Sequence, residues 1–93
     1  MIEREAGRLV VRAPMTMVNA RGLLDAGRSV LQSGEQVFDL GEVCEADSSA
    51  LAVMLGWLRA ASLLRSTIKF ANIPQGLRSL AELYGLSELL PLA

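Results

Sequence analysis

The stretch VFDLGEVCEADSSAL, residues 37–51, decides the fold of this chain. Its first four residues form a β-rich run that is typical of a buried strand. Residues 41–47 are predicted as a loop, and Asp47-Ser48-Ser49 opens a helical pattern that continues to Arg65. Aspartate and serine are favoured at helix starts because their side-chain oxygens accept hydrogen bonds from free backbone amides. A strand, a loop and a long helix in this order predict one unit of an α/β fold.

Further strand and helix patterns alternate on both sides of this stretch. Strands are predicted over residues 9–11, 36–40 and 66–71, and residues 1–5 can pair with the first of these through an Ala6-Gly7 turn. Helices are predicted over residues 16–33, 48–65 and 74–84, with a last turn over 87–90. Because helical crossovers join parallel strands, we expect one α/β domain, a mainly parallel sheet of about four strands covered by about three to four helices. The prediction assigns residues 1–93 to this single domain.

The composition argues against several classes of function. Nine basic and ten acidic residues give a formal net charge of −1 without a basic cluster, so nothing favours nucleic acid. The longest apolar run, residues 50–58, is far shorter than the roughly 20 residues of a membrane span, so no direct membrane insertion is expected. The charged N-terminus does not fit a secretion signal, which favours the cytoplasm. With no histidine and one cysteine, catalytic triads are excluded and an ordinary zinc site is disfavoured, so we expect no enzyme and no cofactor.

The long helix is predicted to have two different sides. A wheel of 100° per residue places on the side that covers the sheet Ala50, Val53, Met54, Trp57, Ala60, Ala61 and Leu64. The same wheel places on the opposite side Ser48, Ala52, Leu55, Arg59, Ser62, Leu63 and Ser66. This second side mixes small and apolar residues with one arginine, a composition that suits a docking surface. A phosphate on Ser48, at the helix tip, would alter both charge and shape there.

Simpler structural roles exist for the same residues. Ser48 can be a plain N-cap, Ser49 a helix-start residue and Arg59 a solvated charge. Asp47 can shape the loop, cap the helix or position Ser48. Residues expected mainly to pack are Trp57, Met15, Met17, Met54 and a semi-buried Cys44.

Several of these motifs together resemble a known family. The run Val37–Leu40, the short loop, the segment Asp47–Ala52 and Arg59 look like the signature of STAS domains. Residues 68–74 and 77–90 resemble the rest of that fold, so the resemblance covers nearly the whole chain. The ending from Leu80 to Leu86, followed by Leu90-Pro91, is similar to the STAS subunit of the bacterial Mla phospholipid ABC-transport complex.

The resemblance implies a non-enzymatic docking subunit. The residue matching Ser48 in that subunit lies at the contact with the ABC-transporter ATPase. We therefore expect a contact formed by Asp47, Ser48, Ser49, Ala52, Leu55 and Arg59. The protein would support an ATPase whose complex maintains outer-membrane lipid asymmetry, at the inner face of the inner membrane through its partner. It would itself bind neither lipid nor nucleotide.

The same resemblance leaves a second function open. In anti-sigma-factor antagonists of the family, the residue matching Ser48 is phosphorylated by a kinase that also acts as the anti-sigma factor. This chain has Ala50 where antagonists usually have glycine, which disfavours that alternative slightly.

Overall fold

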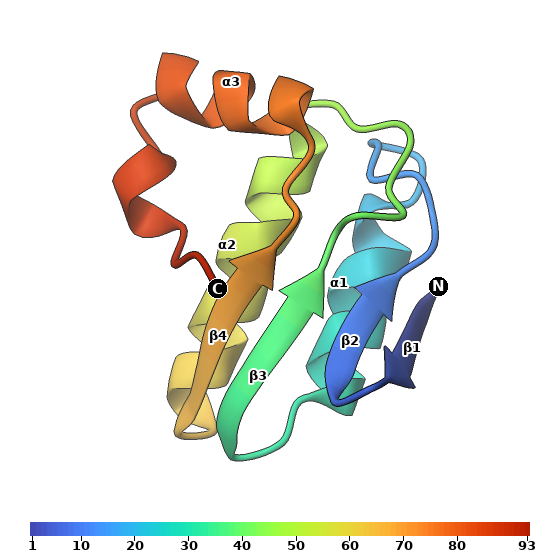
Figure 1. The fold of residues 1–93 in the computed structure, drawn as a ribbon, viewed down its shortest axis with the longest axis vertical. Coiled ribbons are helices and arrows are strands. Elements are labelled where there is room, and N and C mark those ends of the chain that lie inside the picture. Colours follow the sequence, from blue (N-terminus) through green and yellow to red (C-terminus); the bar gives the residue numbers. More distant parts are fainter.

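A four-stranded sheet with the order β1-β2-β3-β4 forms the centre of the computed structural model, which describes residues 1–93 (Figure 1). Its strands are β1 (Ile2–Glu5), β2 (Arg8–Val11), β3 (Gly34–Asp39) and β4 (Ser66–Ala71). The helices are α1 (Ala20–Val30), α2 (Ser49–Leu63), α3 (Gln75–Leu83) and the short 3-10 helix η1 (Ser87–Leu89). Strands β2, β3 and β4 are parallel, and only β1 is antiparallel to its neighbour. The predicted α/β fold with a mainly parallel sheet is confirmed.

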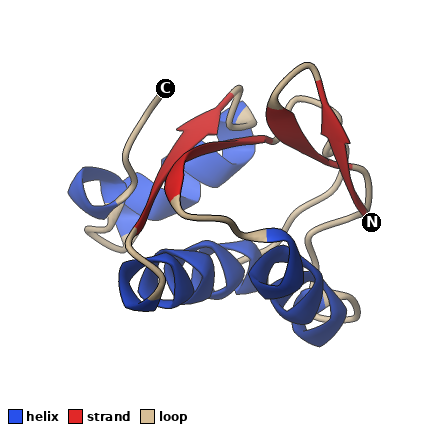
Figure 2. Ribbon diagram, turned by 90° about the horizontal axis from the view of Figure 1, so that it is seen from below, coloured by secondary structure: helices blue, strands red, loops and turns tan.

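The helices are arranged unequally around the sheet. Helices α1 and α2 lie side by side on one face of it (Figure 2). Helix α3 lies at the carboxyl end of the parallel strands, where the strand arrows point in Figure 1. The tail returns to the edge of β4, where the Phe70 N–H donates to the Pro91 carbonyl over 2.8 Å. One sheet face is therefore left without a covering helix. None of the helices has the length and apolar character that crossing a bilayer requires.

The first two strands form the predicted hairpin. Ala6 and Gly7 connect them with positive φ angles of 49° and 78°. Two successive residues with positive φ define a type I′ turn, whose twist matches that of the flanking strands. Strand β1 thereby extends the sheet beyond the parallel strands.

Trp57 lies in the core, as predicted. Its ring is fully buried and stacks on Phe38 with a centroid distance of 4.3 Å. The Trp57 Nε1–H donates to the Leu23 carbonyl of α1 over 3.1 Å, so the ring's one polar group is satisfied. The apolar stripe of α1 is interrupted at Gly27, where the indole takes the missing space: a Cβ there would lie 2.1 Å from Nε1.

The first helix is shorter than predicted. It begins at Ala20 rather than near Thr16, and it ends at Val30 because Leu31 is already extended. The segment before the helix has another role, since Met15 pairs with Ala46 of the loop that precedes α2. A helical periodicity cannot report such a contact with a distant loop.

The side assignment at the end of the long helix is partly wrong. Helix α2 ends at Leu63, and Arg65, with a φ of 54°, turns the chain directly into β4. Ser66 is therefore not on the helix: it starts β4, and its hydroxyl donates to the Gly34 carbonyl over 3.1 Å. Leu64, predicted to cover the sheet, is 49% exposed, and Ala60 is only half-buried. For Leu64 and Ser66 the wheel failed because it extended the helix beyond Leu63, its last residue.

The open face of the sheet is polar. Across neighbouring strands, Arg8 pairs with Asp39 at 3.3 Å and Lys69 pairs with Glu35 at 3.2 Å. Arg12 also binds carboxylates of the β1 strand. Exposed pairs of this kind contribute little to stability, but they keep this face hydrophilic.

Candidate functional site

The predicted site begins where the loop after β3 enters α2. Ser48 is the residue before the helix, with φ −62° and ψ −20°, and Ser49 is the first helical residue. The chain turns tightly here, since the Ala50 N–H donates to the Asp47 carbonyl over 3.0 Å. The entrance lies near the carboxyl ends of the parallel strands, the edge at which open α/β sheets bind their ligands.

Asp47 holds this entrance together. Its Oδ1 accepts a hydrogen bond from the Ser49 N–H over 2.8 Å, and its Oδ2 accepts one from the Met17 N–H over 3.0 Å. The Asp47 N–H in turn donates to the Met15 carbonyl over 3.1 Å. One carboxylate thus fixes the start of α2 to the segment before α1. The hydrogen bond from the Met17 N–H, and after it the one from the Ser49 N–H, hold the pKa of the Asp47 carboxyl below its ordinary value.

The Ser48 side chain does not cap the helix. Asp47 supplies the side-chain oxygen for the helix start, and the Ser48 hydroxyl makes no hydrogen bond within the chain. Its side chain is exposed. The alternative that Ser48 is a plain N-cap is therefore wrong for its side chain. A free hydroxyl on a fixed backbone is available to a partner or to a modifying enzyme.

Two apolar residues beside the entrance were not predicted as part of it. Met17 and Val18 are 76% and 91% exposed, and the Met17 backbone is bonded to Asp47. Met17 was expected to pack inside, which is wrong, whereas Met15 is buried as expected. The sequence did not reveal this exposure, because residues 16–19 were predicted as the start of the first helix. Large exposed apolar side chains next to a polar anchor are typical of interaction surfaces.

The other predicted residues follow along α2. Ala52 is exposed one turn beyond Ser48, and Arg59 is exposed further along the helix. Leu55 is only half-buried and packs against the core, so it is shared between the interior and the surface. Since α2 rises 1.5 Å per residue, Arg59 lies roughly 16 Å from Ser48 along the axis and cannot pair with a group bound there.

A second polar cluster lies at the ends of the strands. The Asp39 carboxylate accepts hydrogen bonds from the Gly41 N–H over 2.9 Å and from Asn72 Nδ2 over 3.1 Å, and it also binds Arg8. Burial would raise the pKa of Asp39, but these donors outweigh burial and hold that pKa below its ordinary value. The cluster lines an open polar depression of about 350 Å³. With its oxygens already occupied, Asp39 is a structural clamp between β3 and the loop after β4.

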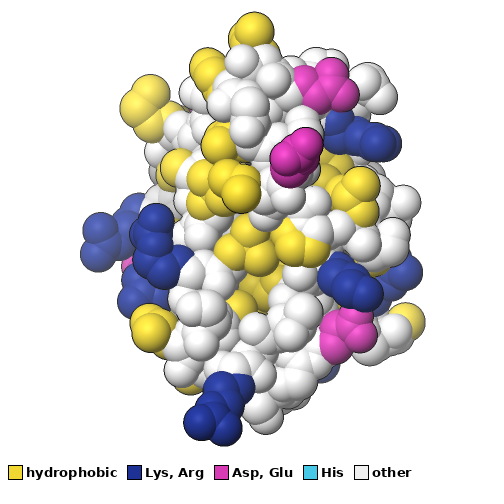
Figure 3. All heavy atoms as spheres, turned by 90° about the vertical axis from the view of Figure 1, so that its left-hand side faces the viewer, with side chains coloured by type: hydrophobic (Ala, Val, Ile, Leu, Met, Phe, Trp, Pro, Cys, Tyr) yellow, Lys and Arg dark blue, Asp and Glu magenta, His cyan; other side chains and the backbone are white.

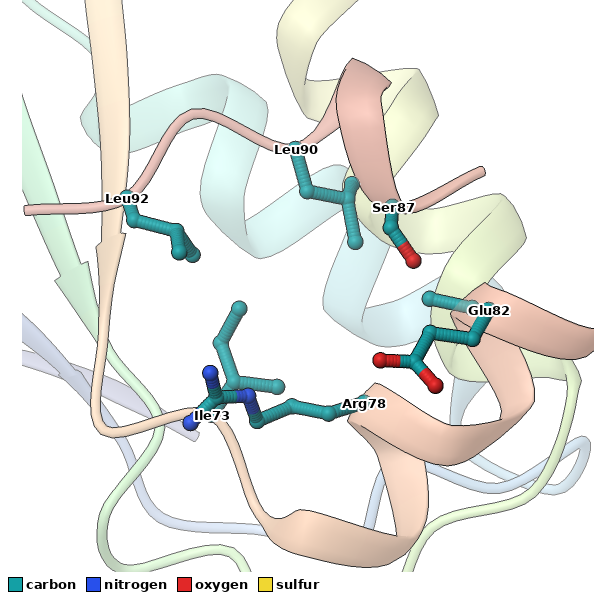
Figure 4. A pocket seen from close by; sticks show the side chains of 7 residues that line it. Ile73, Arg78, Glu82, Ser87, Leu90 and Leu92 are labelled. Atoms are coloured by element: carbon teal, nitrogen blue, oxygen red, sulfur yellow. The ribbon is translucent and has the colours of Figure 1, made fainter. Parts of the chain in front are cut away.

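The pocket between α3, η1 and the tail is small. Figure 4 shows Arg78 and Glu82 of α3 beside a hollow whose other side is formed by Leu90 and Leu92. Its volume of about 90 Å³ is well below the several hundred Å³ of a typical ligand pocket. Cys44, predicted as semi-buried, is exposed in the loop before α2, where its thiol lies 3.7 Å from the Glu42 carbonyl. No group of acidic or thiol side chains is placed to hold a metal ion.

These features define a class: a small α/β domain whose conspicuous groups are a free serine hydroxyl and exposed apolar side chains at a helix start. The family model described as "Mlab, STAS domain" matches residues 1–91, and the chain therefore belongs to the STAS-domain family. No curated protein sequence matches the chain significantly.

Solved structures agree on the fold. A STAS-domain protein from Planctomyces limnophilus matches with a TM-score of 0.72 at 15% identity, over 99% of this chain and 86% of the other. The anti-sigma factor antagonist SpoIIAA, in its unphosphorylated form, matches with a TM-score of 0.72 at 14% identity, over 100% of this chain and 86% of the other. A sulfate transporter family protein from Wolinella succinogenes matches with a TM-score of 0.67 at 12% identity, over 87% of this chain and 67% of the other. At these identities the likeness is one of fold.

Proposed function

We propose that this protein is a docking subunit that binds and supports the ATPase of a phospholipid-transporting ABC complex. The contact consists of the α2 entrance (Asp47, Ser48 and Ser49) together with Ala52 and the exposed parts of Leu55 and Arg59. The family description, which names the Mla STAS protein, supports this choice of partner. The protein acts by binding rather than by turnover, in the cytoplasm at the inner face of the inner membrane.

The observation that carries the proposal is the free Ser48 hydroxyl on a rigid entrance. Asp47 performs the capping, so the serine side chain is left exposed. Met17 and Val18 add exposed apolar area next to it. A partner that covers this area gains from the removal of apolar surface from water and from a hydrogen bond to the hydroxyl.

Co-purification with the ATPase tests the proposed contact. Ser48→Glu and Ala52→Asp each place a carboxylate on the surface without touching the core, so both should abolish the complex. Ser33→Glu is the matched control, since Ser33 is exposed in the loop between α1 and β3 and makes no side-chain hydrogen bond. Retention of the complex by both surface variants would refute this contact. Leu55→Asp is less informative because Leu55 also packs on the core.

A second candidate is an anti-sigma-factor antagonist that a kinase switches by phosphorylating Ser48. The accessible hydroxyl favours it, as does the structural likeness to SpoIIAA. A phosphate would add about −1.5 to −2 charges directly beside the Asp47 carboxylate. Mass spectrometry after incubation with a cognate kinase and ATP separates the two functions. A phosphate on wild-type Ser48, absent from Ser48→Ala, supports the antagonist, and an unmodified wild-type chain removes it.

A further inference from the structure

A surface groove runs between the outer sides of α1 and α2. It encloses about 410 Å³, and its floor consists of Leu24 from α1 with Gly56 and Ala60 from α2. Gly56 lies against the Leu24 side chain, since a Cβ added at this position would be only 2.6 Å from a Leu24 methyl group. The two helices can therefore approach closely, and small residues leave a channel above their contact.

Both walls of the groove carry an arginine without a partner. Arg28 of α1 and Arg59 of α2 line it, and neither makes an ion pair or hydrogen bond within the chain. Arg8, Arg12 and Arg21 bind carboxylates instead. Arg65 and Arg78 are also unpaired, but the groove is lined by two unpaired arginines at once. No acidic residue lines the groove. Figure 3 shows basic side chains gathered at the left edge of that view, with part of an acidic side chain visible among them.

The helix dipole can account for only one of the two unpaired arginines. Arg28 lies in the last turn of α1, where a cation is favoured without any partner. Arg59 lies well inside α2, so this effect does not account for it. Leu63 and Leu64, which also line the groove, are 82% and 49% exposed. The groove therefore combines an apolar floor, exposed leucines and two unpaired cations.

We propose that this groove binds an acidic amphipathic helix of the docking partner. Apolar side chains of that helix would pack on Leu24 and Leu63, and its flanking carboxylates would pair with Arg28 and Arg59. Helices commonly bind proteins in this way, with apolar anchors at helical spacing in a groove. An anionic membrane is disfavoured because the net charge of −1 gives no attraction to a negative surface.

This inference rests on the proposed function and extends its contact. Helix α2 carries Ser48 at its start and Arg59 in its second half, so one partner can bind the entrance and place a helix along the groove. The two contacts would then reinforce each other within one complex.

A model peptide tests the groove without the ATPase. The probe is an 18-residue amphipathic peptide of leucine, alanine and glutamate, titrated into ¹⁵N-labelled protein and followed by NMR. We expect chemical-shift changes centred on Gly56, Ala60 and Leu63. The double variant Arg28→Glu/Arg59→Glu should bind about tenfold more weakly, since it removes two attractions and adds two repulsions. Arg78→Glu, at an exposed arginine of α3 without a partner, should leave the affinity unchanged.

Three outcomes would overturn the inference. Equal binding of a peptide with lysine in place of glutamate would exclude charge recognition. Shift changes away from the groove would exclude this site. Binding to phosphatidylglycerol-containing vesicles that depends on the same two arginines, without binding of the peptide, would assign the groove to a membrane. The amide spectra of the variants report whether they fold. The peptide titration tests the groove, whereas co-purification of Ser48→Glu with the ATPase tests the proposed contact. Either proposal can therefore fail while the other stands.

Discussion

At the scale of single residues, Asp47 and Ser48 divide two tasks that the sequence could not separate. Both residue types are good N-caps, and either could have satisfied the free amides of α2. The structure assigns this task to Asp47, whose second oxygen also binds the Met17 N–H. Ser48 keeps the exposed position and an unused hydroxyl.

This division predicts opposite results for two alanine substitutions. Ser48→Ala should change the free energy of unfolding by less than about 0.5 kcal/mol, because no intramolecular hydrogen bond is lost. Asp47→Ala should lower it clearly, since two backbone amides lose their acceptor. Urea denaturation of both variants provides the measurement. A larger loss in Ser48→Ala than in Asp47→Ala would mean that the serine is the cap.

The lowered pKa of Asp47 predicts a specific dependence on pH. A carboxyl whose pKa is lower in the folded than in the unfolded state stabilises the fold above its unfolded-state pKa of about 4. That contribution is lost as the pH falls through the folded-state value. The difference in unfolding free energy between wild type and Asp47→Asn should therefore be constant near neutrality and shrink in acid. Denaturation series between about pH 2.5 and pH 6 check this, and a difference that grows in acid would contradict it.

At the scale of elements, α1 and α2 fit together through a glycine and a tryptophan. Gly27 leaves the space that the Trp57 ring occupies, and the ring's N–H is bound to the Leu23 carbonyl. The sequence revealed the interruption of the α1 stripe and placed Trp57 in the core separately. It could not join the two observations, because nothing in a single helical period identifies the partner helix.

Glycine-to-alanine substitutions in α1 test this fit. Gly27→Ala should lower the free energy of unfolding by about 1–3 kcal/mol, because its methyl group would overlap the indole. Gly22→Ala is the matched control on the same helix, where the nearest group is the flexible Met1 side chain at 3.5 Å. It should raise stability by up to about 1 kcal/mol through better helix propensity. Stabilisation by both substitutions would contradict the packing described here.

The sequence predicted which helices and strands form better than it predicted where each one begins and ends. Strand β4 matched its predicted range, and the other strands and helices were found within one or two residues of prediction except for α1. Two misplaced boundaries matter for the site. The early start predicted for the first helix concealed the exposed Met17 and Val18. The late end predicted for the long helix let the wheel extend over Ser66, although the same residue was correctly predicted to start the strand. The first error arises because the segment before α1 contacts the loop that precedes α2, which local propensity does not report. The second arises at Arg65, whose positive φ turns the chain out of the helix.

At the scale of the whole molecule, the two faces differ in what they can bind. The open sheet face is covered by cross-strand ion pairs such as Arg8–Asp39. The helix layer instead carries an exposed serine at its entrance and a groove with unpaired arginines. These contrasts arise only when the elements are assembled, since the charges are distributed evenly along the sequence.

A single core predicts a single unfolding transition. Trp57 stacks on Phe38 at the centre of the molecule and touches α1, so its fluorescence reports the loss of the whole core. Thermal unfolding followed by tryptophan fluorescence and by far-UV circular dichroism should give coincident curves. Separate transitions would show that the helix layer and the sheet unfold independently.

In the proposed complex the partner covers the α2 entrance and leaves the open sheet face free. Amide hydrogen exchange of this chain, free and bound to the ATPase, measures this directly. We predict slower exchange in the bound state over residues 15–19 and 47–52, with no change over residues 67–69 of the open face. Slower exchange confined to the open face, with the entrance unchanged, would show that the partner binds the sheet and not the α2 entrance.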